Sequence, residues 1–343
     1  MRRKYRFILF IFFVAGAAAC HKENAAPSVS FQRPANFPEP AYRFANNIIT
    51  KERFELGKKL FYETMLSANN TISCGSCHIQ TSAFTHHGHI VSHGIFDRMG
   101  TRNSPPIMNL AWSTSFMWDG GIADLDLQPI APITNHVEMD ETMENVLNKL
   151  RASSTYPALF NKAYGSEEIS TSNFLKALSQ FMLMCVSSNS RYDSIARGDA
   201  GKSFSADEQD GYTIFKQKCN SCHTEPLFTN YSFRNNGLSI SNVNDEGHYL
   251  ITQNEADKYT FKVPSLRNLA YTAPYMHDGR LLTLDAVLDH YTDQVQQTPN
   301  LDPAFLQNTT PGLAMTADEK RKIKAFLNTL NDKSFLLDKR FAE

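Results

Sequence analysis

Two five-residue motifs, CGSCH at 74–78 and CNSCH at 219–223, each combine two thiols with an imidazole. The CxxC spacing lets both thiols form thioether bonds to the vinyl groups of one haem, and the adjacent histidine presents its imidazole to the iron from the same side. A thioredoxin-like thiol pair or a zinc site does not explain a histidine directly after both pairs. The motifs therefore predict two covalently bound haem c groups. The attaching residues are Cys74, Cys77, Cys219 and Cys222, and the proximal iron ligands are His78 and His223.

A longer pattern repeats downstream of each motif. TRNSPPIMNLAWSTSFMWDGG at 101–121 follows the first motif, and SLRNLAYTAPYMHDGR at 265–280 follows the second. Both segments contain an Arg-Asn pair and an Asp-Gly pair, and both are followed by a leucine six residues after the aspartate. The chain therefore looks duplicated, with one haem in each half.

The duplication allows the two halves to be compared at one position. Thirteen residues after the aspartate of each Asp-Gly pair stands Pro132 in the first half and Tyr291 in the second. Proline cannot bind iron, whereas a tyrosine phenolate does so in catalase. If this position faces the haem in both halves, the first iron keeps a vacant site for peroxide and the second iron is closed. Met276 and His290 compete as ligands of the second iron, and Tyr291 could instead be a core aromatic residue.

Helix signals dominate the remaining sequence. SADE at 205–208 and TADE at 316–319 are capping boxes, and apolar residues follow helical spacing over 143–150 and 323–330. Alternating strand patterns are scarce. We therefore predict a mainly α protein with two cytochrome c-like haem domains related by internal duplication, an N-terminal domain over 48–198 and a C-terminal domain over 199–343.

The chain begins with MRRKYRFILFIFFVAGAAAC. Four basic residues followed by an apolar run of 13 residues predict an export signal over 1–19, because a membrane span needs about 20. The AAAC ending resembles a lipoprotein cleavage site with Cys20 as the lipidated residue, and a plain secreted form is the alternative. Residues 20–47, with four prolines, predict a tether. We expect a periplasmic protein anchored to a membrane.

The overall composition favours an ordinary folded protein. Of the 343 residues, 42% are hydrophobic and 20% are charged, which excludes a disordered chain. The 34 basic and 35 acidic residues nearly cancel, so nothing in the charge predicts binding to nucleic acid.

These motifs together resemble the bacterial di-haem cytochrome c peroxidase and MauG family, over about 54 to 330. The matching stretches are LGKKLFYETMLSANNTISCGSCH, TRNSPP, FMWDGG, QPIAPITNHVEM and VPSLRNLAYTAPYMHDGRLLTLDAV. The resemblance implies that the first haem reduces hydrogen peroxide. It also implies that the second haem receives electrons from a small cytochrome c or cupredoxin, and that the protein could form a homodimer.

The resemblance also implies roles for individual residues. Glu138 matches the distal acid, which would shuttle the peroxide proton, and Gln128 matches a residue of the same pocket. Pro132 leaves that pocket open. Trp118 matches the tryptophan between the two haems, although a packing role is the simpler reading. For Glu138 the simpler reading is an exposed acid early in a helix. The residues that match an inter-domain calcium site are Asn103, Thr272 and Pro274.

The sequence departs from many family members at three places. In the loop FTHHGHIVSHG at 84–94, His93 stands nearest the position of a removable ligand of the first iron, but the loop from His93 to Arg102 is longer than in those members. Tyr291 stands where those members have methionine, which is the MauG-like state. Gln217 stands where MauG has a second tryptophan that draws electrons from a protein substrate.

Three functions follow from these expectations. The first is a peroxidase that reduces hydrogen peroxide to water. The second is a MauG-like oxidase that uses a high-valent iron state to oxidise a protein or a small organic molecule. The third is a non-catalytic electron-transfer cytochrome, which would gain nothing from an open iron equipped with Glu138 and Gln128.

Overall fold

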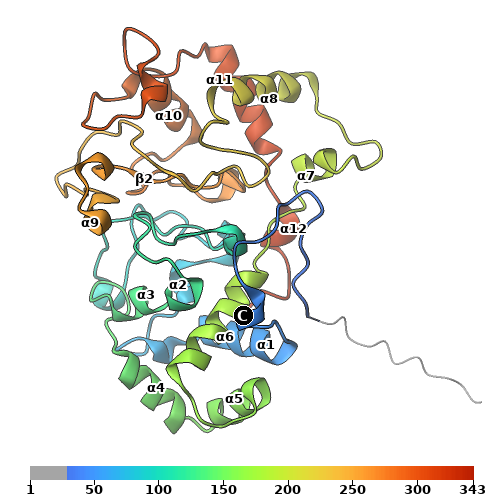
Figure 1. The fold of residues 1–343 in the computed structure, drawn as a ribbon, viewed down its shortest axis with the longest axis vertical. Helices are drawn as coiled ribbons and strands as arrows, with labels where there is room; N and C mark the ends of the chain where they lie inside the picture. Colours follow the sequence, from blue (N-terminus) through green and yellow to red (C-terminus); the bar gives the residue numbers. More distant parts are fainter. Residues whose placement is uncertain (1–28) are drawn as a thin grey trace, which may run out of the picture.

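The computed structural model describes residues 29–343, and it is mainly helical with one two-stranded sheet among them (Figure 1). The predicted export signal, Cys20 and residues 20–28 of the predicted tether lie outside the described residues. No helix in the described part of the chain is both long enough and apolar enough to span a bilayer.

The helices are short and loops of irregular structure connect them. The α-helices are α1 (Lys51–Phe61), α2 (Cys74–Cys77), α3 (Ile130–Thr134), α4 (Met143–Ala152), α5 (Tyr156–Tyr164), α6 (Thr171–Met184), α7 (Arg191–Ala196), α8 (Ala206–Lys218), α9 (Tyr249–Thr252), α10 (Leu284–Asp289), α11 (Ala317–Asn328) and α12 (Lys333–Leu336). A π-helical turn, His290–Gln294, continues α10, and strand β1 (Phe233–Arg234) pairs with β2 (Phe261–Lys262) in antiparallel register. The 3-10 helices are Phe44–Asn46, Thr64–Leu66, Gln80–Ser82, Ile95–Asp97, Leu110–Trp112, Leu125–Leu127, Glu255–Asp257, Leu269–Tyr271 and Pro303–Leu306.

Each half of the molecule has its own hydrophobic core, built on one close pair of helices. In the first half α1 packs on α6, and a Cβ at Gly57 would lie 1.9 Å from the carbonyl oxygen of Ala177. In the second half α8 packs on α11, and a Cβ at Gly211 would lie 2.0 Å from the carbonyl oxygen of Lys322. Only glycine allows backbones to approach so closely. The predicted capping boxes begin α8 and α11, as expected.

Local backbone conformations recur at matching places of the sequence repeat. Asn109 and Asn268 both adopt left-handed conformations, with φ of 57° and 61°. Met117 and Met276 do the same, with φ of 67° and 74°. Each methionine lies inside a short antiparallel bridge, 116 to 122 in the first half and 275 to 281 in the second. The recurrence agrees with the repeat read from the sequence, while internal duplication of whole domains stays a prediction.

Two segments pack against parts of the chain that the predicted domain boundaries assign elsewhere. Residues 29–47 are not a free tether: Phe37 is buried, its ring packs edge-on against Trp112, and the indole of Trp112 donates a hydrogen bond of 2.8 Å to the carbonyl of Pro38. Aromatic residues between the prolines supply the apolar surface that a tether lacks. At the other end, Phe335 and Phe341 join the core of the first half, not that of the second. In Figure 1, α12 accordingly lies beside the lower part of the molecule, which contains α1 and α6.

A buried ion pair ties the connecting segment to the second half. Arg267 and Asp193 are fully buried, and both guanidinium NH groups lie 2.8 Å from the carboxylate oxygens. Asn36 donates a further hydrogen bond to Asp193, and the guanidinium packs over the ring of Phe37. Burial alone would raise the pKa of Asp193, but the bonds from Arg267 hold it below its ordinary value. This cluster fixes the N-terminal segment, α7 and the second half together.

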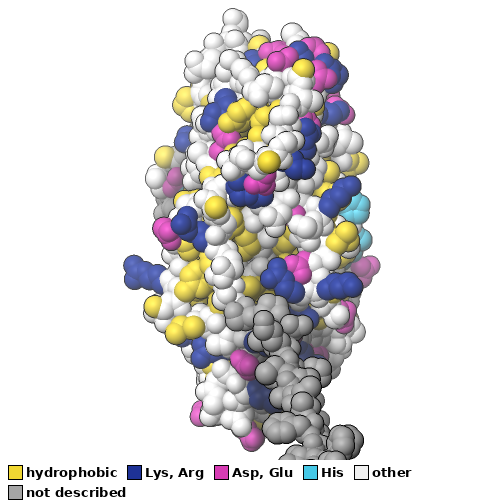
Figure 2. Space-filling model, turned by 90° about the vertical axis from the view of Figure 1, so that its right-hand side faces the viewer, with side chains coloured by type: hydrophobic (Ala, Val, Ile, Leu, Met, Phe, Trp, Pro, Cys, Tyr) yellow, Lys and Arg dark blue, Asp and Glu magenta, His cyan; other side chains and the backbone are white. Residues whose placement is uncertain are grey.

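Charged side chains are mixed on the face that Figure 2 shows, where basic and acidic residues lie interspersed. That face carries no continuous basic patch of the kind that nucleic acid binding needs.

We predict that Asp193→Asn lowers the free energy of unfolding by about 3 kcal/mol or more, because the substitution leaves the charge of Arg267 buried without a partner. Chemical denaturation of the haem-loaded protein measures the change. Asp199→Asn is the control, since Asp199 forms an exposed pair with Arg197, and such pairs contribute less than about 1 kcal/mol. Equal losses in the two variants would contradict the role of the buried pair.

Candidate functional site

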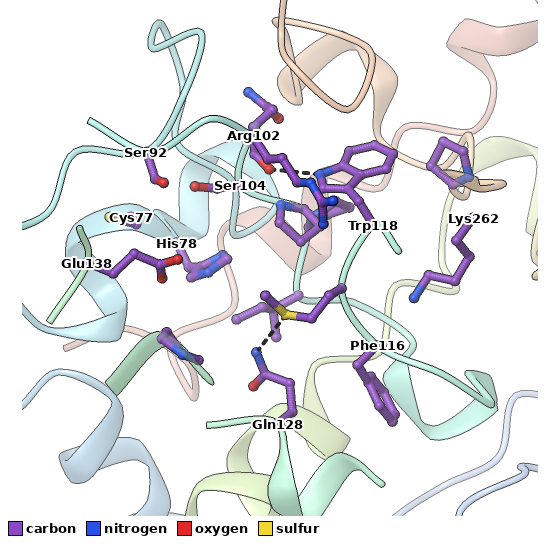
Figure 3. A pocket seen from close by; sticks show the side chains of 18 of the residues that line it. Cys77, His78, Ser92, Arg102, Ser104, Phe116, Trp118, Gln128, Glu138 and Lys262 are labelled. Atoms are coloured by element: carbon purple, nitrogen blue, oxygen red, sulfur yellow. Dashed lines mark hydrogen bonds between the residues drawn. The ribbon is translucent and has the colours of Figure 1, made fainter. Parts of the chain in front are cut away.

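Two cavities lie beside the two CxxCH motifs. The first has a volume of about 780 Å³, within the range of about 300–1,000 Å³ typical of ligand sites, and Cys77 and His78 line it (Figure 3). The second is smaller, about 200 Å³, and is lined by Cys219, Cys222 and His223. A further small hollow next to the first cavity is lined by Cys74. All six residues of the predicted haem attachment therefore lie at cavity walls.

Both proximal histidines are held by the same kind of hydrogen bond. Nδ1 of His78 lies 2.7 Å from the carbonyl oxygen of Phe84, and Nδ1 of His223 lies 3.1 Å from those of Phe228 and Pro264. This bond fixes the tautomer and leaves Nε2 as the metal-binding nitrogen. Burial lowers the pKa of His78 and lowers that of His223 to about 4, so both rings stay neutral, as an iron ligand requires.

The four motif cysteines are free thiols, and no disulfide competes for them. Burial raises the pKa of Cys74 and Cys219 to about 12 and that of Cys77 to about 11. They are therefore neutral thiols next to a cavity with an oriented imidazole. This donor set fits two covalently attached haem groups.

The residues predicted for peroxide chemistry meet in the first cavity. Gln128, Pro132 and Glu138 all line it together with His78. Glu138 does not lie on a helix, because α4 begins only at Met143. Burial raises the pKa of Glu138, although a hydrogen bond of 2.9 Å from the side chain of Asn135 partly opposes the shift. The alternative reading of Glu138 as an exposed helical acid is therefore not what the structure has.

A close backbone contact positions Glu138. A Cβ at Gly94 would lie 2.2 Å from the carbonyl oxygen of Val137 and 2.4 Å from that of Glu138. The amide of the next residue, Ile95, donates a hydrogen bond of 2.8 Å to the Glu138 carbonyl. The loop that follows the first CxxCH motif thus supports the turn that carries the acid.

Comparison with known proteins agrees with this geometry. A family model described as di-haem cytochrome c peroxidase matches residues 51–201. Methylamine utilization protein MauG of Methylorubrum extorquens is 36% identical over 325 residues, which cover 92% of this chain and 87% of that protein. Cytochrome c551 peroxidase of Pseudomonas aeruginosa is 30% identical over 307 residues, covering 86% of this chain and 83% of that protein.

The chain belongs to the di-haem cytochrome c peroxidase and MauG family. Membership implies two haem c groups and an oxidoreductase activity. Among solved structures, a MauG-like protein associated with microbial copper homeostasis superposes with a TM-score of 0.79 at 32% identity, covering 91% of this chain and 98% of that chain. The di-haem peroxidase BthA of Burkholderia thailandensis has a TM-score of 0.74 at 20% identity, covering 87% of this chain and 91% of that chain, a likeness of fold alone.

Trp118 lies in the wall shared by the two cavities of this di-haem protein. Its indole Nε1 donates a hydrogen bond of 2.8 Å to the carbonyl oxygen of Asn103 (Figure 3). A side chain in this shared wall is compatible with the predicted position between two haems and with the simpler packing role.

The wall of the second cavity contains two of the three predicted ligands. Tyr291 and Met276 both line it, whereas His290 does not and instead places Nε2 3.0 Å from the carbonyl oxygen of Asn236. Tyr291 lies on the π-helical turn and stacks on Phe305, with 5.7 Å between ring centroids. Such single π-turns are frequent at functional sites. Burial raises the pKa of Tyr291 to about 12, so binding as a phenolate requires the positive charge of an iron.

The side chain of His93 is not among those that line the first cavity, although the thiol of Cys77 donates to its carbonyl oxygen at 3.5 Å. His93 lines neither cavity, and its Nδ1 lies 3.1 Å from Oδ1 of Asp97. The rings of His86 and His89 stack at 4.1 Å, and no group of three or more His, Cys, Asp or Glu side chains among residues 29–343 is arranged to hold a metal ion. Binding of the first iron by His93 stays a prediction, and it requires the imidazole to turn away from Asp97.

The three residues matched to a calcium site lie together. Asn103, Thr272 and Pro274 all line the second cavity. The Asn103 side-chain amide donates hydrogen bonds to the carbonyl oxygens of His89 and Ile90, at 3.3 and 3.0 Å. Calcium binding by these residues stays a prediction.

Two basic residues that line the first cavity were not predicted from the sequence. Arg102 pairs with Asp119 at 2.5 Å and with both carboxylate oxygens of Asp245, at 2.6 and 2.7 Å, which ties the two halves together. Lys262 on β2 lines both cavities. The TRNSPP motif could have indicated Arg102, but nothing in the sequence marks Lys262.

We predict that Tyr291→Phe changes the ferric absorption spectrum of one haem and leaves that of the other unchanged, because one iron loses an oxygen ligand. Tyr275→Phe is the control, since Tyr275 lines the same cavity but its hydroxyl donates to the carbonyl of Leu269. Met276→Leu tests the competing ligand. If Met276→Leu alters the spectrum and Tyr291→Phe does not, methionine is the ligand.

Proposed function

We propose that this protein is a di-haem c-type peroxidase. It reduces hydrogen peroxide to water at the N-terminal haem, with electrons delivered through the C-terminal haem from a small cytochrome c or cupredoxin. The observation that carries the proposal is the set of residues lining the first cavity. An acid with a raised pKa, an amide and a proline that cannot bind iron all line the cavity beside His78.

The chemistry needs both polar side chains. Hydrogen peroxide takes two electrons and two protons to give two molecules of water, and the haem of the first cavity supplies the metal and the electrons when bound. Glu138 accepts the proton of the oxygen that binds and returns it to the oxygen that leaves, which makes the leaving group water. Its raised pKa suits this exchange, since a carboxyl that titrates nearer neutrality can both take and give a proton. The amide of Gln128 orients the peroxide.

Electrons would pass between the cavities through Trp118. The shared wall supports this route, because the indole contacts both cavities and is fixed by its bond to Asn103. Tyr291, or Met276 in its place, would close the second iron so that it carries electrons only. The two cytochrome c-like halves, as products of an internal duplication, would then differ in one coordination position.

A MauG-like oxidation of a protein or small organic substrate is the second candidate. Tyr291 in the wall of the second cavity and the 36% identity to a MauG protein favour it. Gln217, which stands where MauG has a second tryptophan, is exposed on α8 and lines neither cavity. An electron relay through this position is therefore absent, which favours peroxide reduction. A carrier without turnover has no use for Glu138 and Gln128.

We also propose that the protein works in the periplasm, held to a membrane through Cys20 or secreted, and that Asn103, Thr272 and Pro274 bind Ca²⁺. The two proposals rest on sequence and on the shared position of these three residues. A calcium-selective chelator should then lower peroxide turnover, and added Ca²⁺ should restore it.

We predict that Glu138→Gln lowers kcat/KM for peroxide by at least about 100-fold, because a glutamine cannot carry the proton. Steady-state oxidation of a reduced small cytochrome measures the effect. Glu144→Gln, an exposed acid at the start of α4, should leave turnover unchanged. Consumption of peroxide no faster than with free haem, in wild type and variant alike, would exclude a peroxidase.

Trp118→Phe should slow electron transfer from the second haem to the first and leave peroxide binding intact. The phenyl ring keeps the packing but loses the indole and its bond to Asn103. Rapid mixing of the reduced protein with peroxide separates the two steps. Trp112→Phe is the matched control, because Trp112 is the other tryptophan of the chain and lines neither cavity. A normal rate in Trp118→Phe would place the electron route elsewhere.

A further inference from the structure

Lys262 lines both cavities, and it brings a positive charge to the wall of the first cavity without an ion-pair partner of its own. Its ammonium donates a hydrogen bond of 2.5 Å to the carbonyl oxygen of Ser115 and lies 5.8 Å from the ring centre of Phe116. No carboxylate among the described residues lies within ion-pair distance of it. The other basic side chain of this cavity, Arg102, is fully paired with Asp119 and Asp245.

The ammonium of Lys262 therefore has too few hydrogen-bond acceptors and no ion-pair partner among the described residues. An ammonium has three donors, and one backbone carbonyl accepts from only one of them. Burial accordingly lowers the pKa of Lys262 to about 8. An unpaired cation withdrawn from water costs free energy unless an anion accompanies it, and Asp119, whose charge partly opposes the lowered pKa of Lys262, is already paired with Arg102.

The position of Lys262 indicates which anion pairs with its ammonium group. Figure 3 shows the ammonium pointing into the cavity from the side opposite Cys77 and Glu138. A haem bound through thioethers is tethered at its vinyl groups, next to Cys74 and Cys77. Its two propionates lie on the part of the macrocycle away from the vinyl groups, so they would extend toward the side of the cavity that Lys262 occupies. They are carboxylates, the natural partner of an ammonium.

We propose that Lys262 forms an ion pair with a propionate of the haem in the first cavity and thereby sets its orientation and its reduction potential. The inference rests on the proposed attachment of haem at Cys74 and Cys77, but not on peroxide turnover. A neighbouring cation favours the reduced iron, which carries one positive charge fewer than the oxidised iron. Lys262 is thus a positioning residue and touches no substrate.

The proposal predicts a change in one haem only. In Lys262→Met the reduction potential of one haem falls, and the resonance Raman bands of propionate bending shift, while the other haem keeps its potential. Lys262→Arg restores both, because it keeps the charge. Lys258→Met is the matched control: Lys258 lies four residues earlier in the chain, pairs with Glu246 at 2.9 Å and lines neither cavity.

Spectroelectrochemical titration of the haem-loaded proteins, each first checked for two attached haems, gives the result. An unchanged potential in Lys262→Met, an equal fall at both haems, or the same fall in Lys258→Met would overturn the proposal. If Lys262→Met does not retain two haems, the reduction potentials of Lys262→Gln are measured instead and judged by the same criteria. Glutamine keeps a donor for the Ser115 carbonyl but carries no charge. A protein that shows the shift but does not reduce peroxide contradicts the proposed function alone.

Discussion

The hydrogen bond between each proximal imidazole and a backbone carbonyl is the constraint on which the rest of the structure depends. His78 and His223 are held through Nδ1 by the carbonyls of Phe84 and Phe228, and both phenylalanines adopt left-handed backbone conformations, with φ of 59° and 56°. The turn that bends the chain back after each CxxCH motif therefore also aims the iron-binding nitrogen. Everything else in each cavity is placed relative to that nitrogen.

The two cavities share this arrangement and differ in other residues of their walls. The first has Pro132, Gln128 and Glu138, whereas the second has Tyr291; Met117 and Met276, which match in the repeat, line one cavity each. A side chain that cannot bind iron leaves room for a small reactant, and one that can bind iron fills the place. This difference supports the proposal that one site is reactive and the other passes electrons.

The sequence by itself determined the chemistry that is local. The CxxCH spacing, the capping boxes and the repeated Arg-Asn and Asp-Gly pairs depend on neighbouring residues, so the motifs predicted haem attachment, the start of α8 and α11, and Tyr291 at the second cavity. Resemblance to a family added Glu138, Gln128 and Trp118, which line the first cavity, while their roles stay predictions. The sequence also predicted a mainly helical protein correctly.

Only the tertiary structure decided what depends on contacts between distant segments. His93 and His290 carry the right ring for iron, yet the loop and the π-helical turn direct them to Asp97 and Asn236. Residues 29–47 read as a tether because four prolines interrupt the segment from 20 onward, but their aromatic side chains pack on a core formed far along the chain. Lys262 belongs to a two-residue strand without any local signal, and its importance arises from the cavity and from the lack of an ion-pair partner among the described residues. Long-range packing, which no local spacing encodes, fixed these features.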